Sequence, residues 1–218
     1  MKILFFGDSI TDAGRNRDGS NHMSTLGWGF VRVIADRLLG DSPDKYEIVN
    51  RGISGNRVVD LYARIKCDAW NLQPDVISIL IGVNDVWHEV TRGNGVELDR
   101  FENVYRMLIA DTKKALPNTK LILCEPFVLE GTATENTAEI PDKYQRFCAV
   151  YEYAKVAKKL AEEFDLPFVA LQEKLTKAAE KSKAEYYLAD GAHPHIAGAT
   201  LIADEWTKVF KENFEKKN

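Results

Sequence analysis

Short apolar runs that end in glycine and polar residues recur along the whole chain. Five of them are predicted to be strands, at about residues 2–6, 46–50, 75–81, 119–124 and 166–171. Amphipathic stretches with the period of a helix separate these runs, so each strand is followed by a helix before the next strand begins. Strands that alternate with helices favour a parallel sheet with helices on both faces. The sequence therefore predicts a three-layer α/β/α fold with a five-stranded parallel sheet.

Helices are expected where apolar residues recur at spacings of three and four. They are predicted at about residues 27–39, 58–69, 98–116, 144–164, 172–181 and 196–214. Three polar segments are expected to be loops: 12–25, 82–96 and 125–141. Residues 211–218 are expected to form a frayed, solvated tail, and we expect Trp28 and Trp70 to lie in the core.

Size and composition limit the classes of function open to the chain. With 218 residues and no internal repeat, we expect a single domain, residues 1–218. A net charge of −4 argues against nucleic acid as a partner, and the apolar runs are too short to span a membrane. Cys67, Cys124 and Cys148 are too scattered for a metal motif, and their odd number favours a reducing compartment. Residues 1–25 lack a signal-peptide pattern, so we expect a cytoplasmic protein.

A serine follows the first predicted strand, at the edge where parallel α/β sheets bind their ligands. Ser9 comes two residues after Gly7, which ends the apolar run. A serine hydroxyl is a weak nucleophile at neutral pH. It needs a base, an acid that orients the base, and donors that stabilise an oxyanion. A catalytic role for Ser9 therefore requires these groups elsewhere in the chain.

The segment Asp190-Gly-Ala-His193 offers a base and an orienting acid. In a turn, a spacing of three can bring the carboxylate onto the imidazole, where it fixes the tautomer and stabilises the protonated ring. Neither side chain falls on an apolar helical face, which makes a core role less attractive. His195 competes for the role of base, but the last helix is expected to begin there and to turn its side chain elsewhere.

Two further segments follow predicted strands and offer oxyanion donors. Gly55 lacks a side chain, so a substrate oxygen can approach its backbone N–H closely. The amide of Asn84 is a neutral donor suited to a developing oxyanion. Taken alone, each residue also has a plainer role, in which Gly55 serves a turn and Asn84 caps a loop.

The order of these segments resembles that of the GDSL esterases, the SGNH-hydrolase superfamily. The blocks similar to those of the family are Gly7–Thr11, Asn50–Asn56, Gly82–Asp85 and Asp190–Pro194. Together they span positions 7 to 194, nearly the whole chain. The resemblance implies a flavodoxin-like SGNH-hydrolase fold. No Gly-x-Ser-x-Gly elbow surrounds Ser9, which argues against the ordinary α/β-hydrolase fold.

The resemblance also implies a role for each matching residue. Ser9 is the implied nucleophile, His193 the general base and then general acid, and Asp190 the residue that orients His193. The implied oxyanion hole consists of the backbone N–H groups of Ser9 and Gly55 and the side chain of Asn84. No metal and no other cofactor is implied.

Two more residues are candidates for substrate binding. Asp8 belongs to the first block, where we expect it to hold the turn, and we count it with Trp87 as a candidate substrate-binding residue. An aromatic ring beside polar groups suits a sugar, although a lone tryptophan is at least as often a packing residue.

Within the superfamily the chain is most similar to the intracellular acetylxylan esterases. The matching stretches are Gly7–Asp12 with Gly14 and Arg15, Gly52–Asn56, Ile81–Trp87 and Glu125–Phe127. The resemblance implies an esterase that acts on acetylated carbohydrates such as xylo-oligosaccharides and that forms a homo-oligomer. The chain departs from the subgroup at Ala189, where we expect tryptophan, and this position bears on the shape of the acetyl pocket.

Two alternatives remain. The same residues suit a general carboxylesterase, a lysophospholipase or a thioesterase, which differ from an acetylesterase in acyl-chain preference. A non-enzymatic, flavodoxin-like binding module is the other alternative. The acids of Gly7–Asp12 argue against it, because they would repel a phosphate at the first turn.

Overall fold

Five parallel strands form one sheet in the order β2-β1-β3-β4-β5. The structure is a computed structural model that describes residues 1–19 and 23–215, so Asn21 of the first loop and the last three residues of the predicted tail lie outside it. The strands are β1 (Lys2–Gly7), β2 (Glu47–Asn50), β3 (Val76–Leu80), β4 (Lys120–Cys124) and β5 (Phe168–Val169). The sheet order is that of flavodoxin-like proteins, and the predicted fold class is confirmed.

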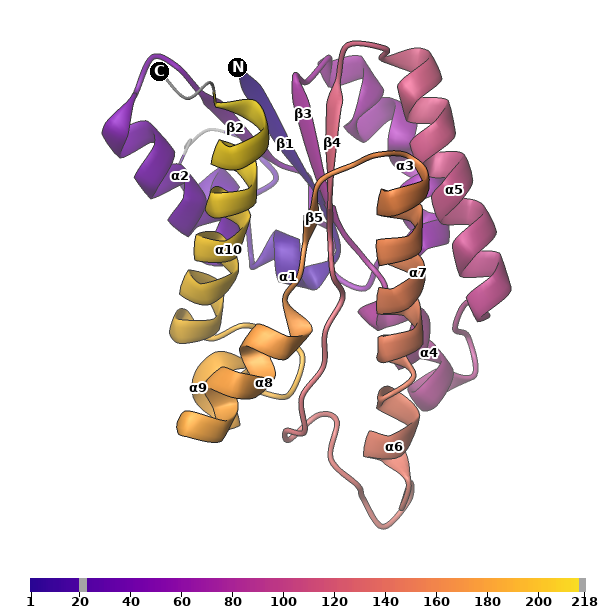
Figure 1. Cartoon of the computed structure of the whole chain (residues 1–218). Coiled ribbons are helices and arrows are strands. Elements are labelled where there is room, and N and C mark those ends of the chain that lie inside the picture. Colours follow the sequence, from indigo (N-terminus) through magenta and orange to yellow (C-terminus); the bar gives the residue numbers. More distant parts are fainter. Residues whose placement is uncertain (20–22, 216–218) are drawn as a thin grey trace.

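Helices connect the strands and cover the sheet. They are α1 (Ser9–Asp12), α2 (Phe30–Asp41), α3 (Val58–Asp68), α4 (Val83–Arg92), α5 (Leu98–Ala115), α6 (Lys143–Phe147), α7 (Val150–Glu163), α8 (Gln172–Lys181), α9 (Ala184–Tyr187) and α10 (Ile196–Phe214). Two single turns of 3-10 helix lie at Ser24–Leu26 and Trp70–Leu72. Helices α2 and α10 pack together on one face of the sheet, and α3, α5 and α7 pack on the other (Figure 1).

The core lies between the sheet and these two layers. Every residue of β3 is buried, which explains why Val76–Leu80 reads as a continuous apolar run rather than an alternating one. Phe5 on β1 packs against Phe30 of α2 and Trp206 of α10. The buried indole N–H of Trp206 donates to Ser78 Oγ at 2.9 Å, so this polar group inside the core is satisfied.

Most predicted elements are present, but the predicted loop 82–96 is wrong for residues 83–92, which form α4. Val83, Val86 and Val90 are buried on one side of this helix, at the spacing of three and four that indicates a helix. Asn84 and Asp85 interrupt the apolar pattern, which hides the helical spacing in the sequence. The predicted helix 144–164 is also divided in two, α6 and α7.

The expectation that Trp28 lies in the core is wrong, because its side chain is 78% exposed. It precedes α2, and the buried stripe of that helix begins at Phe30 and continues through Val31 and Ile34. Trp70 is half-buried and packs against the core, as expected, with its indole N–H donating to Thr112 Oγ1 at 3.1 Å.

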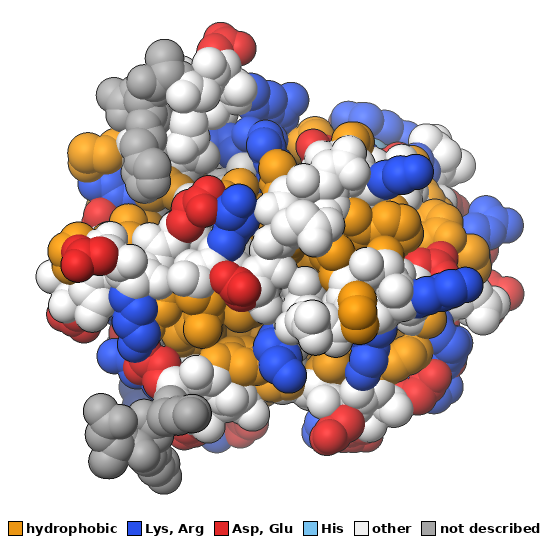
Figure 2. Space-filling view, turned by 90° about the horizontal axis from the view of Figure 1, so that it is seen from above, with side chains coloured by type: hydrophobic (Ala, Val, Ile, Leu, Met, Phe, Trp, Pro, Cys, Tyr) orange, Lys and Arg blue, Asp and Glu red, His pale blue; other side chains and the backbone are white. Residues whose placement is uncertain are grey.

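The two ends of the sheet differ. Figure 2 shows the end at which the strands begin, where hydrophobic side chains lie among charged ones. A hollow of about 610 Å³ at this end is lined by residues that include Met1, Val76 and Phe214, and its described lining residues include no serine, cysteine or histidine. No described helix is long and apolar enough to cross a membrane.

Candidate active site

The order of the strands reverses between β1 and β3, and ligands of open α/β sheets bind beside such a point, outside the carboxyl ends of the strands. Ser9 follows β1 and Asn84 follows β3, so both flank this reversal. Gly55 follows β2, the other neighbour of β1. The three residues predicted from strand ends therefore share one edge of the sheet.

Ser9 is held by a sharp turn from strand to helix. Gly7 permits this turn, since a Cβ there would lie 2.3 Å from Thr11 Oγ1 in the following helix and 2.5 Å from the carbonyl oxygen of Leu80 on β3. Asp8 then caps α1, and its Oδ1 accepts a hydrogen bond of 2.9 Å from the backbone N–H of Ile10. Ser9 is the first residue of α1 and is partly exposed beside a fully buried Asp8.

His193 and Asp190 lie next to Ser9 although they are about 180 residues away in sequence. Ser9 Oγ is 2.9 Å from Nε2 of His193. Nδ1 of His193 is 2.7 Å from Oδ2 of Asp190. Because an ionised carboxylate can only accept, Nδ1 carries the proton, and Nε2 is left to accept a proton from Ser9.

The pKa values of these groups suit a base and its orienting acid. The hydrogen bond to Asp190 raises the pKa of His193 above its ordinary value of 6.5, although partial burial opposes this. Partial burial alone would raise the pKa of Asp190. Hydrogen bonds from the His193 ring and from the backbone N–H groups of His193 and Ala192 outweigh burial and lower that pKa to about 2. Asp190 is therefore ionised at neutral pH and stabilises a protonated His193.

The predicted oxyanion donors follow strands at the same edge of the sheet as Ser9. No carbonyl or side chain of the described residues accepts a hydrogen bond from the backbone N–H of Ser9 or of Gly55. Gly55 has a φ of +82°, which favours glycine, and an added Cβ would have only Nε2 of His88 near it, at 4.0 Å. The Asn84 amide donates to the carbonyl of Asn56 at 3.1 Å, which ties β3 to the segment that carries Gly55 and leaves one amide hydrogen for a ligand.

Arg64 on α3 was not singled out from the sequence, yet it joins the segments that carry these residues. Its guanidinium donates to the carbonyl of Gly7 at 3.0 Å, to the carbonyl of Arg51 at 2.9 Å and to Asn56 Oδ1 at 2.7 Å. It also forms an ion pair with Asp68 at 2.9 Å. One side chain thus fixes the end of β1 and the segment after β2 relative to each other. An arginine on a helix carries no pattern from which this could be predicted.

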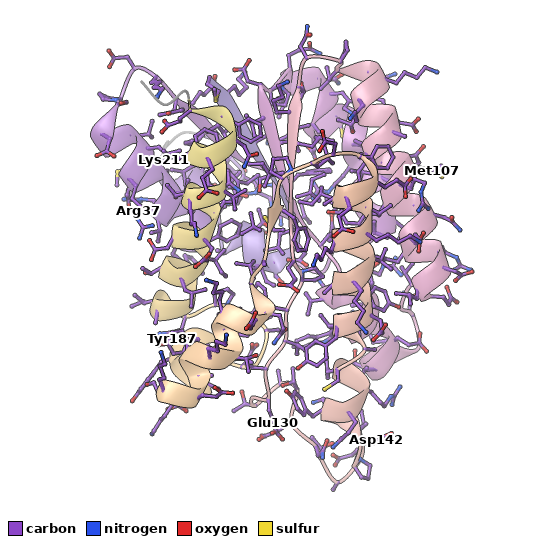
Figure 3. All side chains as sticks on the ribbon, in the orientation of Figure 1. Arg37, Met107, Glu130, Asp142, Tyr187 and Lys211 are labelled. Carbon is purple, nitrogen blue, oxygen red and sulfur yellow. The ribbon has the colours of Figure 1, made fainter. Side chains whose placement is uncertain are left out.

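The loop between β4 and α6 supports the turn that carries Asp190. The Leu129 N–H donates to the Gly191 carbonyl at 2.8 Å, and the Ala133 N–H donates to the Asp190 carbonyl at 2.9 Å. Gly131 faces Gly191 so closely that a Cβ on Gly131 would lie 2.5 Å from the Gly191 nitrogen. In Figure 3, Glu130 of this loop and Tyr187 of α9 lie in the lower half of the molecule, whereas Lys211 near the end of α10 lies in the upper half.

Thr134 holds this supporting loop in shape. Its side chain is fully buried, and its Oγ1 donates to the Leu129 carbonyl at 2.7 Å and accepts from the Gly131 N–H at 2.9 Å. Thr134 is therefore a positioning residue for the Asp190 turn. The sequence marked this segment only as a long loop, and nothing in its pattern indicated what it contacts.

The structure also places the remaining candidates. The Asp8 carboxylate has no exposed surface, and burial raises its pKa to about 7, which fits the turn-holding role better than contact with a substrate. Trp87 on α4 is half-buried between Phe147 and His193, with its ring 6.0 Å from the His193 ring, centroid to centroid. His195 is exposed and lies at the start of α10, so His193 and not His195 is the histidine beside Ser9.

The chain is similar to known proteins over most of its length. The model of the GDSL-like lipase/acylhydrolase family matches residues 5–201. The acetylxylan esterase of Geobacillus stearothermophilus is 35% identical over 208 residues, 93% of this chain and 90% of that protein. Its crystal structure covers 98% of this chain and 94% of its own, with a TM-score of 0.83 and 33% identity. A protein from Parabacteroides merdae that is described as GDSL-like covers 95% of this chain and 94% of its own, with a TM-score of 0.86 and 43% identity.

Further structures of the Geobacillus stearothermophilus protein are of mutants. One of them describes it as an acetyl-xylooligosaccharide esterase. Three others are catalytic mutants of it, in which an aspartate, a serine or a histidine is replaced by alanine.

Proposed function

The chain belongs to the GDSL-like lipase/acylhydrolase family, and from this premise we propose that it removes O-acetyl groups from acetylated xylo-oligosaccharides. It is a carboxylic ester hydrolase similar to acetylxylan esterases over nearly its whole length. The observation that carries the proposal is the hydrogen-bonded row of Ser9, His193 and Asp190, with 2.9 Å and 2.7 Å between successive partners. The same three residue types are changed in the catalytic mutants of the similar esterase.

In the first step, Ser9 Oγ forms a bond to the carbonyl carbon of the acetyl ester, and its proton moves to Nε2 of His193. Asp190 stabilises the resulting imidazolium through the contact at Nδ1. The bond between the carbonyl carbon and the sugar oxygen then breaks. His193 returns its proton to that oxygen, the free sugar leaves, and the acetyl group stays on Ser9.

In the second step, water replaces the sugar. His193 Nε2 takes one proton from the water as its oxygen bonds to the acetyl carbon. The bond between that carbon and Ser9 Oγ then breaks, and the proton goes to Ser9 Oγ. Acetic acid is released and loses its remaining proton to the solvent as acetate, and the three residues are restored to their starting protonation states.

Both steps pass through a negative charge on the former carbonyl oxygen. The backbone N–H groups of Ser9 and Gly55 and the amide of Asn84 are the donors for this oxygen. They are fixed before the reaction by α1, by the positive φ of Gly55 and by the contact between Asn84 and Asn56. Donors held in place in this way favour the transition state over the flat ester, because they need not reorganise as the charge develops.

We extend the proposal to the setting of the enzyme. Cys67, Cys124 and Cys148 are all free thiols, which fits the cytoplasm, where thiols stay reduced. The resemblance to intracellular acetylxylan esterases further supports a homo-oligomer, which light scattering of the purified protein tests directly.

Acetate release from acetylated xylo-oligosaccharides, compared with a series of 4-nitrophenyl esters, tests the proposed activity. We expect acetate release from the sugars and a fall in kcat/KM from acetyl to butyryl to octanoyl esters. A preference for octanoyl esters, with no release of acetate from the sugars, would contradict the proposal in favour of a lipid-directed or general esterase.

A further inference from the structure

Trp28 presents a large aromatic surface to solvent beside the nucleophile. Its side chain is 78% exposed, which is unusual for a residue that gains much from burial. It lines a pocket of about 290 Å³ together with Ser9 and His193. None of the catalytic steps uses this side chain, so its exposure at this place requires another explanation.

The position of the indole is fixed by close contacts between two segments. The backbone N–H of Trp28 donates to the backbone carbonyl of Ala13 at 3.0 Å. Gly27 adopts a φ of +73°, and an added Cβ there would lie 2.5 Å from the Asp12 carbonyl oxygen. A Cβ on Gly14 would clash with the six-membered ring of Trp28, so the indole rests directly against the Gly14 backbone. The ring is therefore a fixed wall of the pocket and needs little ordering when a ligand binds.

The pocket lies on the side of Ser9 from which the sugar leaves. It is lined by His193 and Pro194, whereas the oxyanion donors Gly55 and Asn84 are not among its lining residues. His193 must give its proton to the leaving oxygen, so the leaving sugar has to lie on the His193 side of Ser9. The pocket therefore faces the sugar and not the oxyanion.

The size and lining of the pocket fit a sugar ring. Its volume is at the lower end of the roughly 300–1,000 Å³ typical of ligand sites, which suits one ring better than a long acyl chain. Ile10, Ala13 and Pro194 add apolar surface, and the exposed residue Ser54 adds a hydroxyl group that also donates to Asp12 Oδ2 at 3.5 Å. A pyranose has the matching surface, with one apolar face of C–H groups and a rim of hydroxyls.

We propose that Trp28 is the stacking platform for the sugar ring that carries the scissile acetyl ester. This inference rests on the proposed function and adds the residue that selects a carbohydrate as the leaving alcohol. A second copy of this chain seated on Trp28 is the competing explanation for the exposed ring, and the experiment below separates the two.

Product inhibition tests the platform without depending on turnover of the sugar ester. Unacetylated xylotriose should inhibit the hydrolysis of 4-nitrophenyl acetate, because it occupies the leaving-group side of the site. In Trp28→Ala we expect its inhibition constant to rise about tenfold, the size expected for the loss of one aromatic contact. The inhibition constant of Trp28→Phe should lie between those of the native enzyme and Trp28→Ala. Met107→Ala is the matched control, because Met107 is also exposed but lies on α5, away from the site (Figure 3), and should change the constant less than twofold.

Three results would overturn the inference. The first is an inhibition constant that does not change in Trp28→Ala, and the second is a native enzyme that xylotriose does not inhibit. The third is a change in oligomer size in Trp28→Ala with unchanged inhibition. This third result would assign Trp28 to an interface between copies of the chain. Release of acetate from acetylated xylotriose by the native enzyme, measured in parallel, keeps the two proposals apart. If acetate is released while inhibition is unaffected by Trp28→Ala, only the platform fails; if none is released, the proposed function fails.

Discussion

The two halves of the candidate site are built in different ways. Ser9, Gly55 and Asn84 follow strands whose backbones are fixed by the sheet and by a buried core. Asp190 and His193 belong to no strand of the sheet. Their turn is closed by an isolated bridge between Leu188 and Pro194, and hydrogen bonds from the loop 125–141 hold it in addition. The nucleophile and the oxyanion donors thus depend on the central fold, while the base depends on its own turn and on the loop that supports it. We call Ser9, Gly55 and Asn84 the strand side of the site, and Asp190 and His193 the turn side.

The carboxylates of the two halves show the same contrast. Asp8, on the strand side, is fully buried; loss of solvation raises its pKa to about 7, against the hydrogen bond from Ile10. Asp190, on the turn side, is partly exposed, and three hydrogen bonds lower its pKa to about 2 despite partial burial. Burial therefore disfavours the charged form of the carboxyl group that holds the fold, whereas hydrogen bonds favour the charged form of the one that orients His193. This difference explains why two aspartates next to catalytic residues have different roles.

Removal of the base has the largest expected effect. His193→Ala should lower kcat/KM for 4-nitrophenyl acetate by about 10³- to 10⁴-fold or more, because Ser9 then lacks a proton acceptor. His195→Ala is the matched control, and its exposed side chain predicts a change of less than twofold. The reverse pattern would assign the base to the wrong histidine.

Loss of one donor on the strand side comes next. Asn84→Ala should reduce kcat by about 100- to 1,000-fold with a smaller effect on KM, because its amide acts mainly in the transition state. Asn118→Ala, at an exposed position before β4, should leave both constants unchanged. A rise in KM alone would mean that Asn84 binds substrate and does not stabilise the oxyanion.

A smaller and more specific effect is expected on the turn side. Thr134→Val removes the hydroxyl that shapes the supporting loop, and the resulting shift of Asp190 should lower kcat/KM about tenfold to a hundredfold. The hydrogen bond to Asp190 raises the pKa of His193, so weakening it should move the acid limb of the pH–rate profile to lower pH. Thr134→Ser should restore the native profile. Thr137→Val, farther along the same loop, is the control.

If Thr134→Val lowers the rate but leaves the acid limb in place, the loop does not act through Asp190. If Thr137→Val has the same effect as Thr134→Val, the loss reflects general loosening of the loop.

The smallest effect concerns stability rather than rate. Because folding raises the pKa of Asp8 from its ordinary 3.8 to about 7, its contribution to stability is complete below pH 3.8 and is lost as the pH rises to about 7. Asp8→Asn keeps an acceptor for the Ile10 N–H and cannot ionise. The free energy of unfolding of Asp8→Asn minus that of the native protein, measured by urea unfolding, should therefore increase from pH 4.5 to pH 7.5. A difference that is constant with pH would contradict the burial account of Asp8.

The same division decides what could be predicted from the sequence. The strand side follows local rules, since an apolar run, a glycine and a polar residue mark a strand end, and these rules located Ser9, Gly55 and Asn84. The Asp190–His193 pair was found from its spacing, but its support by Gly131 and Thr134 depends on contacts across about 60 residues that leave no local pattern.

Trp28 and α4 were misjudged for different reasons. Valines at positions 83, 86 and 90 did indicate a helix, and polar residues between them obscured it. For Trp28 the sequence favoured burial because large aromatic side chains usually pack in cores. Only the flanking glycines, Gly27 and Gly29, indicate an unusual backbone, which here places the indole outside the core.

The most direct test of the central claim is covalent labelling with a serine-reactive organophosphonate, followed by peptide mapping by mass spectrometry. We predict a single adduct on Ser9 in the native protein, no adduct in Ser9→Ala, and much slower labelling in His193→Ala than in His195→Ala. Absence of any adduct from the native protein, or an adduct that persists in Ser9→Ala, would contradict the assignment of Ser9 as a nucleophile activated by His193.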